Sequence, residues 1–163
     1  MQAPLRSRLR RLVPPLRTLA ASALVVLLAP RAQAALGEAA ASVDRDAAAL
    51  SAARAGDGAR PGYTVTTLVA EGLTVREYLT PAGQVFAVAW DGVGRPDLDA
   101  LLGAQAREYR AALAAAPRAG DRRGRRVETA HLVVEVWGHM RHDQGRAWLP
   151  GLLPAGVSVD AIR

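Results

Sequence analysis

In the middle of the chain the sequence pattern changes to the period of two that β-strands show, over three segments. They are 63–70 (YTVTTLVA), 73–79 (LTVREYL) and 84–90 (QVFAVAW), and they are rich in β-branched and aromatic residues. The sequence TPAG joins the last two segments and suits a type I turn followed by a left-handed glycine. The pattern therefore predicts an antiparallel meander.

The hairpin of 73–79 and 84–90 has two largely apolar faces. If Thr80 faces Gln84 across the turn, Tyr78 pairs with Phe86 on one face. The other face then carries Leu73, Val75, Glu77, Leu79, Val85, Ala87 and Ala89. An antiparallel sheet with one solvated side alternates more cleanly than this, so we expect other elements to cover both sides.

The period of two returns in the last third of the chain, in HLVVEVWGHM at 131–140. Residues 145–150 (GRAWLP) are its predicted partner strand, and Asp143, Gln144 and Gly145 are predicted to form the turn. With the meander, the sequence predicts an antiparallel sheet of about five strands.

Apolar residues at helical spacing appear in two places. The stronger helix is predicted over 96–116, where Pro96 suits a first helical position and Pro117 ends the pattern. Its apolar stripe consists of Leu98, Leu101, Leu102, Gln105, Tyr109, Ala112 and Leu113. A lesser, alanine-rich helix is predicted at 38–53, and 55–62 (AGDGARPG) is interpreted as a linker. The fold class is α+β, with one main helix packed on the sheet.

The N-terminus has the three parts of an export signal. A basic stretch with five arginines precedes the uncharged run LAASALVVLLA at 19–29, and AQA ends at Ala34. We expect cleavage between Ala34 and Ala35, and hence a periplasmic or secreted protein. An uncut anchor is the alternative, but the run is short against the about 20 residues of a membrane span.

The predicted organisation is therefore a signal peptide (1–34), an N-terminal helix with a linker (35–62) and an α+β domain (63–163), with 35–163 as one mature domain. The net positive charge of the chain is confined to the predicted signal peptide. The full chain has 21 basic and 15 acidic residues, but six arginines and no acidic residue lie within 1–34. The mature part is thus neutral, so its bulk charge does not indicate a nucleic-acid partner.

The motif GHMRHDQG at 138–145 contains two of the three histidines. A metal or hydrolytic site would use His139, His142 and Asp143. A spacing of three places strand side chains on opposite faces, and zinc takes three or four ligands, so we expect a polar hairpin tip instead. The chain lacks cysteine, and its serines stand in no Gly-x-Ser-x-Gly motif. We therefore predict no catalytic, metal or cofactor site.

Two surfaces are candidates for contact with a partner. The first joins the predicted strand face of Trp137 to the hairpin tip, and consists of Trp137, His139, Arg141, His142 and Asp143. The second is the charged loop 117–126, in which Arg122, Arg123, Arg125 and Arg126 could bind an anionic surface. No aromatic residue is interleaved there, as single-stranded nucleic acid would require.

Several stretches together resemble an exported bacterial family, the domain of unknown function 2844. They are REYLTPAGQVFAVAWDG, RPDLDALLG, GHM and GRAWLPGLLPAGVSVDAIR, and the ALG after the predicted cleavage position is similar too. The resemblance covers nearly all of 35–163 and implies a small envelope or secreted protein. It implies no catalytic or binding residues.

From these observations we expect a non-enzymatic, exported binding or accessory module. Its partner would be an envelope protein or a ligand, and it would meet a membrane only through an uncleaved signal. The alternatives are an enzyme that uses the His139–Asp143 region and an anionic-surface binder that uses the arginine loop.

Overall fold

The computed structural model describes residues 36–93, 95–116, 124–139 and 141–163. The predicted signal peptide and its cleavage position between Ala34 and Ala35 lie outside these ranges. None of the helices within them has the length and apolar content that a membrane crossing requires.

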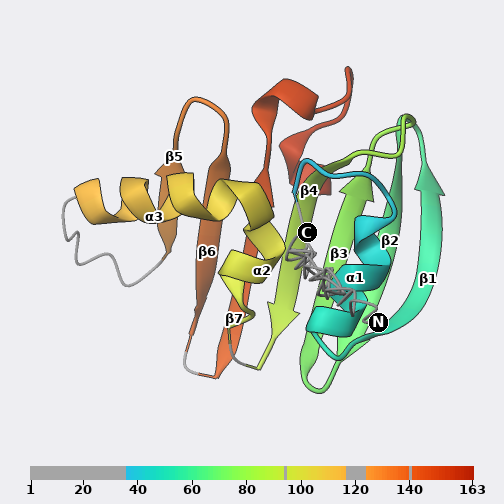
Figure 1. The fold of residues 1–163 in the computed structure, drawn as a ribbon, viewed down its shortest axis with the longest axis horizontal. Coiled ribbons are helices and arrows are strands. Elements are labelled where there is room, and N and C mark those ends of the chain that lie inside the picture. Colours follow the sequence, from blue (N-terminus) through green and yellow to red (C-terminus); the bar gives the residue numbers. More distant parts are fainter. Residues whose placement is uncertain (1–35, 94, 117–123, 140) are drawn as a thin grey trace, which may run out of the picture.

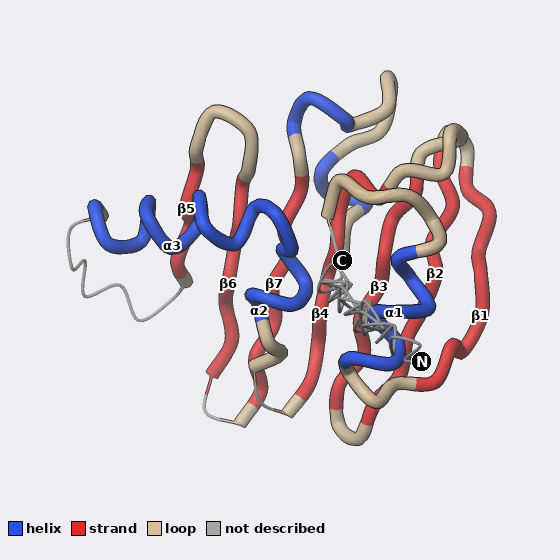
Figure 2. Tube along the Cα trace, viewed as in Figure 1, coloured by secondary structure: helices blue, strands red, loops and turns tan. Residues whose placement is uncertain are grey.

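In the described part of the chain, seven antiparallel strands form one sheet, in the order β1-β2-β3-β4-β7-β6-β5 (Figures 1 and 2). The strands are β1 (Ala53–Arg60), β2 (Tyr63–Ala70), β3 (Leu73–Leu79), β4 (Val85–Gly92), β5 (Arg125–Glu128), β6 (Val133–His139) and β7 (His142–Trp148). Two runs of neighbouring strands, β1–β4 and β5–β7, join where β4 pairs with β7. The predicted α+β class is confirmed, but the sheet has two more strands than expected.

The two additional strands are the edges of the sheet. β1 takes up most of the predicted linker 55–62, and β5 takes up the end of the predicted loop 117–126. Glycine and arginine give these segments little strand propensity of their own. β1 nevertheless pairs with β2 from Ala53–Val69 to Arg60–Tyr63, because the regular neighbour offers a complete row of hydrogen-bonding groups. The linker prediction is therefore wrong.

Helices α1 (Ser42–Ala49), α2 (Leu98–Leu102) and α3 (Ala106–Ala115) lie on one side of the sheet, here called the helix face (Figure 1). α1 is shorter than the predicted helix 38–53. The predicted helix 96–116 is divided by Gly103, whose φ of 52° begins a 3-10 turn between α2 and α3. Asp97 caps α2 by accepting hydrogen bonds from the backbone N–H groups of Asp99 (2.9 Å) and Ala100 (3.2 Å).

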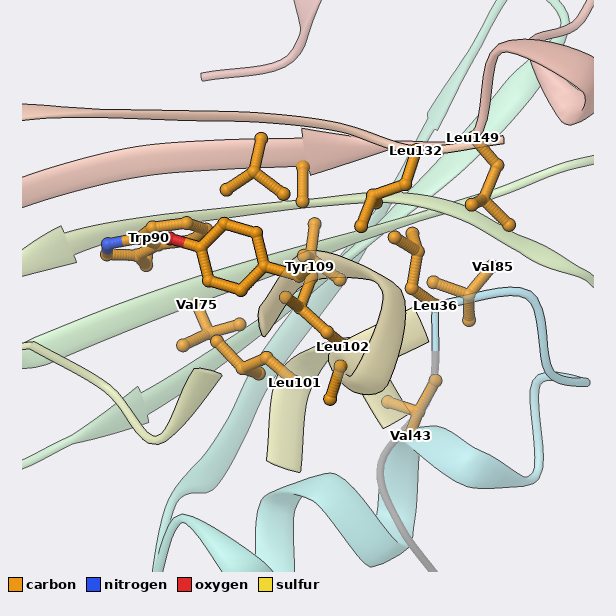
Figure 3. Packing of buried hydrophobic residues seen from close by; sticks show 14 of the residues in the cluster. Leu36, Val43, Val75, Val85, Trp90, Leu101, Leu102, Tyr109, Leu132 and Leu149 are labelled. Carbon is orange, nitrogen blue, oxygen red and sulfur yellow. The ribbon is translucent and has the colours of Figure 1, made fainter. Parts of the chain in front are cut away.

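The main core lies between the helices and the sheet (Figure 3). Its buried members include Leu36, Val43, Leu68, Val75, Val85, Val88, Trp90, Leu101, Leu102, Tyr109, Leu132, Val134 and Leu149. Leu101, Leu102 and Tyr109 belong to the apolar stripe that the helical spacing predicted, so the stripe does pack against the sheet.

The opposite side of the sheet, here called the tail face, is covered in part by residues 149–163. Ile162 of this tail is fully buried in a second cluster with Tyr78, Phe86 and Trp148. The Tyr78 hydroxyl donates to the main-chain oxygen of Arg163 (2.7 Å) and accepts from its N–H group (2.9 Å). The sheet is thus covered on both faces, as its two apolar faces predicted.

The register of β3 and β4 differs from the predicted one by a residue. Tyr78 pairs with Ala87 instead of Phe86, and Leu79 pairs with Val85, because a bulge leaves Phe86 without an opposite residue. Phe86 and Ala87 therefore both lie on the tail face, and the following alternation places Val88 and Trp90 in the helix-face core. A bulge cannot be recognised from the period of two in the sequence, which is why the predicted register of these two strands is wrong.

Gly145 of β7 lies opposite Trp90 of β4, at the junction of the two strand runs. A Cβ atom at this glycine would overlap the indole ring of Trp90 and would also come within 2.7 Å of the main-chain oxygen of Glu135. The largest fully buried side chain therefore occupies the space that the glycine leaves.

We expect Gly145→Ala to destabilise the fold by about 2 kcal/mol or more, since the overlapping atoms belong to a ring and to a backbone that cannot easily move. Chemical denaturation measures the change. Gly151→Ala is the matched control, because a Cβ atom there meets no atom within 4 Å. Equal stabilities of the two variants would contradict this account of the junction.

Candidate functional site

A cleft of about 460 Å³ opens on the helix face, between α3 and the ends of β5, β6 and β7. It is lined by Arg95, Tyr109, Leu113, Gly124, Arg125, Val136, Trp137, Gly138, His139, His142 and Asp143. This set combines residues from α3, β5, β6 and β7 and from the segments before α2 and β5. We call it the α3 cleft.

Four polar side chains give the α3 cleft its chemistry. Arg95 Nε lies 3.1 Å from Asp143 Oδ2, and the other carboxylate oxygen, Oδ1, is buried without a hydrogen-bond partner among the described residues. Arg125 is exposed at the start of β5 and makes no ion pair with a described residue. Burial raises the pKa of Tyr109, against the opposing effect of the Arg95 and Arg125 charges. The tyrosine therefore keeps its proton at neutral pH.

Leu113 and Val136 supply apolar surface beside these groups. Two guanidinium groups and one carboxylate leave the α3 cleft with an excess of positive charge. It can accept a group that is acidic at one end and apolar at the other, because guanidinium groups bind planar oxygen pairs through two parallel hydrogen bonds.

The hairpin at this cleft turns at a different place from the predicted one. β6 ends at His139 and β7 begins at His142, and Arg141 adopts a left-handed φ of 69°. Asp143 and Gly145, which were predicted to form the turn, are strand residues that pair with Gly92 and Trp90 of β4. Turn-forming residue types were thus overridden by sheet pairing.

The structure divides the predicted contact surface. His139 and His142 form a cross-strand pair, and Trp137 pairs with Gln144, so these side chains share the tail face. Asp143 is on the helix face with Arg95. The α3 cleft lies at the ends of these strands, and residues of both faces contribute to its lining. They include all members of the surface except Arg141, which is exposed at the hairpin tip.

A chain of hydrogen bonds links the hairpin to β4 on the tail face. Trp137 Nε1 donates to Gln144 Oε1 (2.9 Å), and the Gln144 amide donates to Asp91. The other carboxylate oxygen of Asp91 lies 3.1 Å from His142 Nε2. The aspartate partner of His142 is therefore Asp91, 51 residues away, and not the neighbouring Asp143.

The postulated metal site of His139, His142 and Asp143 is not assembled. The two imidazole rings are 6.1 Å apart, whereas Asp143 points to the opposite face of the strand. Among the residues that the structure describes, no group of three or more histidine and acidic side chains could hold a metal ion.

The arginine loop is also divided. Arg122 and Arg123 lie outside the described residues. Arg125 and Arg126 belong to strand β5 and not to a loop, and alternation sends their side chains to opposite faces. Arg126 binds Glu128 (2.9 Å) and Glu135, so its charge is already neutralised. Of the two arginines described, only Arg125 can meet a ligand with its charge unpaired.

Arginine and tryptophan side chains alternate on the tail face of β5–β7. The Arg146 guanidinium lies 5.8 Å from the centre of the Trp137 ring and 5.4 Å from that of Trp148. Arg126 lies over Trp148 at 5.6 Å. Trp148 is buried and Trp137 half-buried, so the tryptophans contribute cation–π packing within the domain.

Sequence reasoning did not find Arg95 and Tyr109 as site residues. Arg95 precedes the helix start and Tyr109 is part of an ordinary apolar stripe, so neither carries a local signal. Only the packing of α3 near the β6–β7 hairpin brings them together.

It also overlooked a pair of buried acidic residues, Glu77 of β3 and Asp46 of α1. Glu77 is 0% exposed and Asp46 is 2% exposed. Burial raises the pKa of Glu77 to about 9, and the hydrogen bond with Asp46 and the repulsion between the two carboxylates add to the rise. Glu77 is therefore protonated at neutral pH, beneath a helix and away from both the cleft and the hairpin.

The model of the family "Protein of unknown function (DUF2844)" matches residues 32–162. The chain belongs to this family. The match spans the sheet, the three helices and nearly all of the tail, and so includes the α3 cleft. No curated protein and no solved structure matches the chain.

The raised pKa of Glu77 predicts how stability changes with pH. Between the ordinary pKa of 4.5 and about 9, the folded protein holds a proton that the unfolded chain has released. We therefore expect the free energy of unfolding to fall as pH rises through this window, and Glu77→Gln to make the slope less steep. Urea denaturation across the window measures it, with Glu71→Gln in an exposed turn as the control. Unchanged slopes in both variants would disprove the assignment.

Proposed function

We propose that this protein is an exported, non-enzymatic binding module that holds an acidic group of an envelope partner in the α3 cleft. The observation that carries the proposal is the convergence of Arg95, Tyr109 and Arg125 on one hollow, beside the hairpin that the sequence indicated as a contact surface. The guanidinium groups and the protonated phenol can donate hydrogen bonds to a carboxylate.

The arrangement of these groups favours binding over catalysis. Arg95 is held by Asp143, and a guanidinium group is a hydrogen-bond donor that does not act as a base. Tyr109 is a hydrogen-bond donor whose raised pKa opposes loss of its proton. Groups that keep their protonation state suit recognition, whereas a general acid or base needs a pKa near the working pH.

Export is supported by the basic stretch, the short apolar run and the AQA sequence of residues 1–34. The charge balance agrees with it, since the excess of arginine is confined to this segment and the remainder is neutral.

The N-terminus of the exported protein tests the cleavage position. Mass spectrometry of the envelope and secreted fractions should find a chain that begins at Ala35. Ala34→Arg should leave the precursor uncut, because signal peptidase requires a small residue there. Gln33→Asn, at the position that the motif leaves open, should be processed normally. A full-length chain confined to the cytoplasm would contradict export.

Site-specific photo-crosslinking tests the binding role. A crosslinker at Arg141, expressed with the native signal in the native envelope, should capture one dominant partner. A crosslinker at the exposed Ala48 of α1, over the other end of the sheet, should not capture it (Figure 1). Adding Arg125→Gln should reduce the crosslink about tenfold, since hydrogen bonds to charged groups are the stronger ones.

Arg107→Gln is the matched control, because this α3 arginine is exposed and does not line the cleft. Equal capture from Ala48, or capture that does not depend on Arg125, would refute the α3 cleft as the contact site. If no crosslinker position captures a protein, the proposal of a protein partner is refuted.

A further inference from the structure

A second hollow, of about 330 Å³, lies on the tail face at the opposite edge of the sheet. It is lined by Gly58, Arg60, Tyr63, Val65, Thr67, Arg76, Tyr78, Ala161 and Arg163. The residues come from β1, β2, β3 and the end of the tail, and we call this hollow the arginine groove.

The arginine groove concentrates positive charge. Arg60, Arg76 and Arg163 reach it from three separate elements, and none of the lining side chains is acidic. The nearest acidic residue of β1, Asp57, pairs with Thr66 on the helix face, where it binds the Thr66 hydroxyl (2.7 Å) and Arg54 (2.8 Å). Strand alternation thus keeps this carboxylate away from the groove.

None of the three arginines makes an ion pair with an acidic side chain among the described residues. Arg76 Nη1 donates to the main-chain oxygen of Arg163 (3.3 Å) and so helps to hold the tail. The Arg60 and Arg163 side chains make no ion pair with any residue that the structure describes; Arg60 donates only to the main-chain oxygen of Ala59 (3.1 Å). Like charges gathered around one hollow repel one another, and an anion would relieve that repulsion.

Gly58 of β1 leaves part of the groove wall without a side chain. A Cβ atom at Gly58 would come within 3.5 Å of the Arg60 guanidinium, so this side chain lies over the space that the glycine leaves. The glycine-rich sequence that suggested a linker therefore has a second consequence: it removes side chains from one wall of the hollow.

Hydroxyl and aromatic groups complete the walls. Thr67 and Tyr63 bring hydroxyl groups, and the Tyr63 ring packs against Tyr78 and Phe86 at centroid distances of 6.0 and 6.1 Å. The tyrosine positions are thus fixed by the tail-face core and not by surface contacts alone.

We propose that the arginine groove binds a phosphate monoester group. A carboxylate offers two oxygens and is satisfied by one guanidinium fork, whereas a phosphate offers several oxygens to donors that arrive from different directions. Arg60 and Arg163 supply the charge, and the Thr67 hydroxyl supplies a neutral donor. The groove volume of about 330 Å³ can hold a phosphate together with a small organic group.

The phosphate could belong to a soluble ester or to a lipid headgroup, and two probes separate these sources. sn-Glycerol 3-phosphate, with glycerol as the neutral analogue, is titrated into the purified protein by calorimetry. Phosphatidylcholine vesicles with and without phosphatidic acid, which carries the same phosphoglycerol, are tested by co-sedimentation. Binding to the phosphate form should weaken with added salt.

Arg60→Gln and Arg163→Gln should each weaken binding about tenfold, since each removes a charge-assisted donor. Both side chains are exposed, and the contacts that hold the tail use only the backbone of Arg163, so the fold should persist. Arg107→Gln is the control and should bind as the unchanged protein does, because this arginine lines neither hollow.

Arginine-dependent binding of glycerol 3-phosphate alone would identify a soluble ester, and binding of phosphatidic acid vesicles alone would identify a lipid headgroup. Binding of neither probe would overturn the proposal, as would binding that both groove variants retain in full. Because Arg60 and Arg163 line the arginine groove and not the α3 cleft, failure here is separate from failure of the proposed partner contact.

Discussion

The pairing of β4 with β7 is the constraint on which the rest of the fold depends. Each run of strands, β1–β4 and β5–β7, has short connections within it, but only this ladder joins them into one sheet. At its centre Trp90 lies over Gly145, and no other residue type leaves the indole room. The chain from α2 to α3 spans the two runs and covers this junction, and Leu101, Leu102 and Tyr109 pack with Trp90 in one cluster (Figure 3).

The same junction positions the candidate site. The β4–β7 register places Asp91 opposite Gln144, which brings His142 and Trp137 into one hydrogen-bonded chain on the tail face. On the helix face it sets Asp143 against the segment before α2, where Arg95 meets it. The α3 cleft is therefore a product of long-range pairing, and a shift of one residue in this ladder would send Asp143 to the other face.

Local patterns in the sequence predicted the regular part of this structure well. The period of two in 63–70 and 73–79 and the apolar stripe of Leu101, Leu102 and Tyr109 mark elements whose burial matches their spacing. The edge strand β1 was not predicted, because pairing with β2 stabilises a glycine-rich segment that has little strand propensity of its own. The bulge at Phe86 places Val88 and Trp90 on the opposite face from the predicted one, and no residue type in the segment indicates it. The cleft residues Arg95 and Tyr109 are 14 positions apart in separate elements, so only the packed fold reveals them.

Arg146 connects the two halves of the tail face. Its Nη1 donates to the main-chain oxygens of Val159 (2.7 Å) and Ile162 (3.3 Å), while its Nε binds Glu135 (2.7 Å). The Arg146 guanidinium thus contacts both the carbonyl oxygens of the tail and the Trp137 ring. Arg163 reaches the arginine groove only because the tail is held in this way and by Tyr78. The groove and the α3 cleft share no lining residue and lie at opposite edges of one sheet, so a ligand in one would leave the other open.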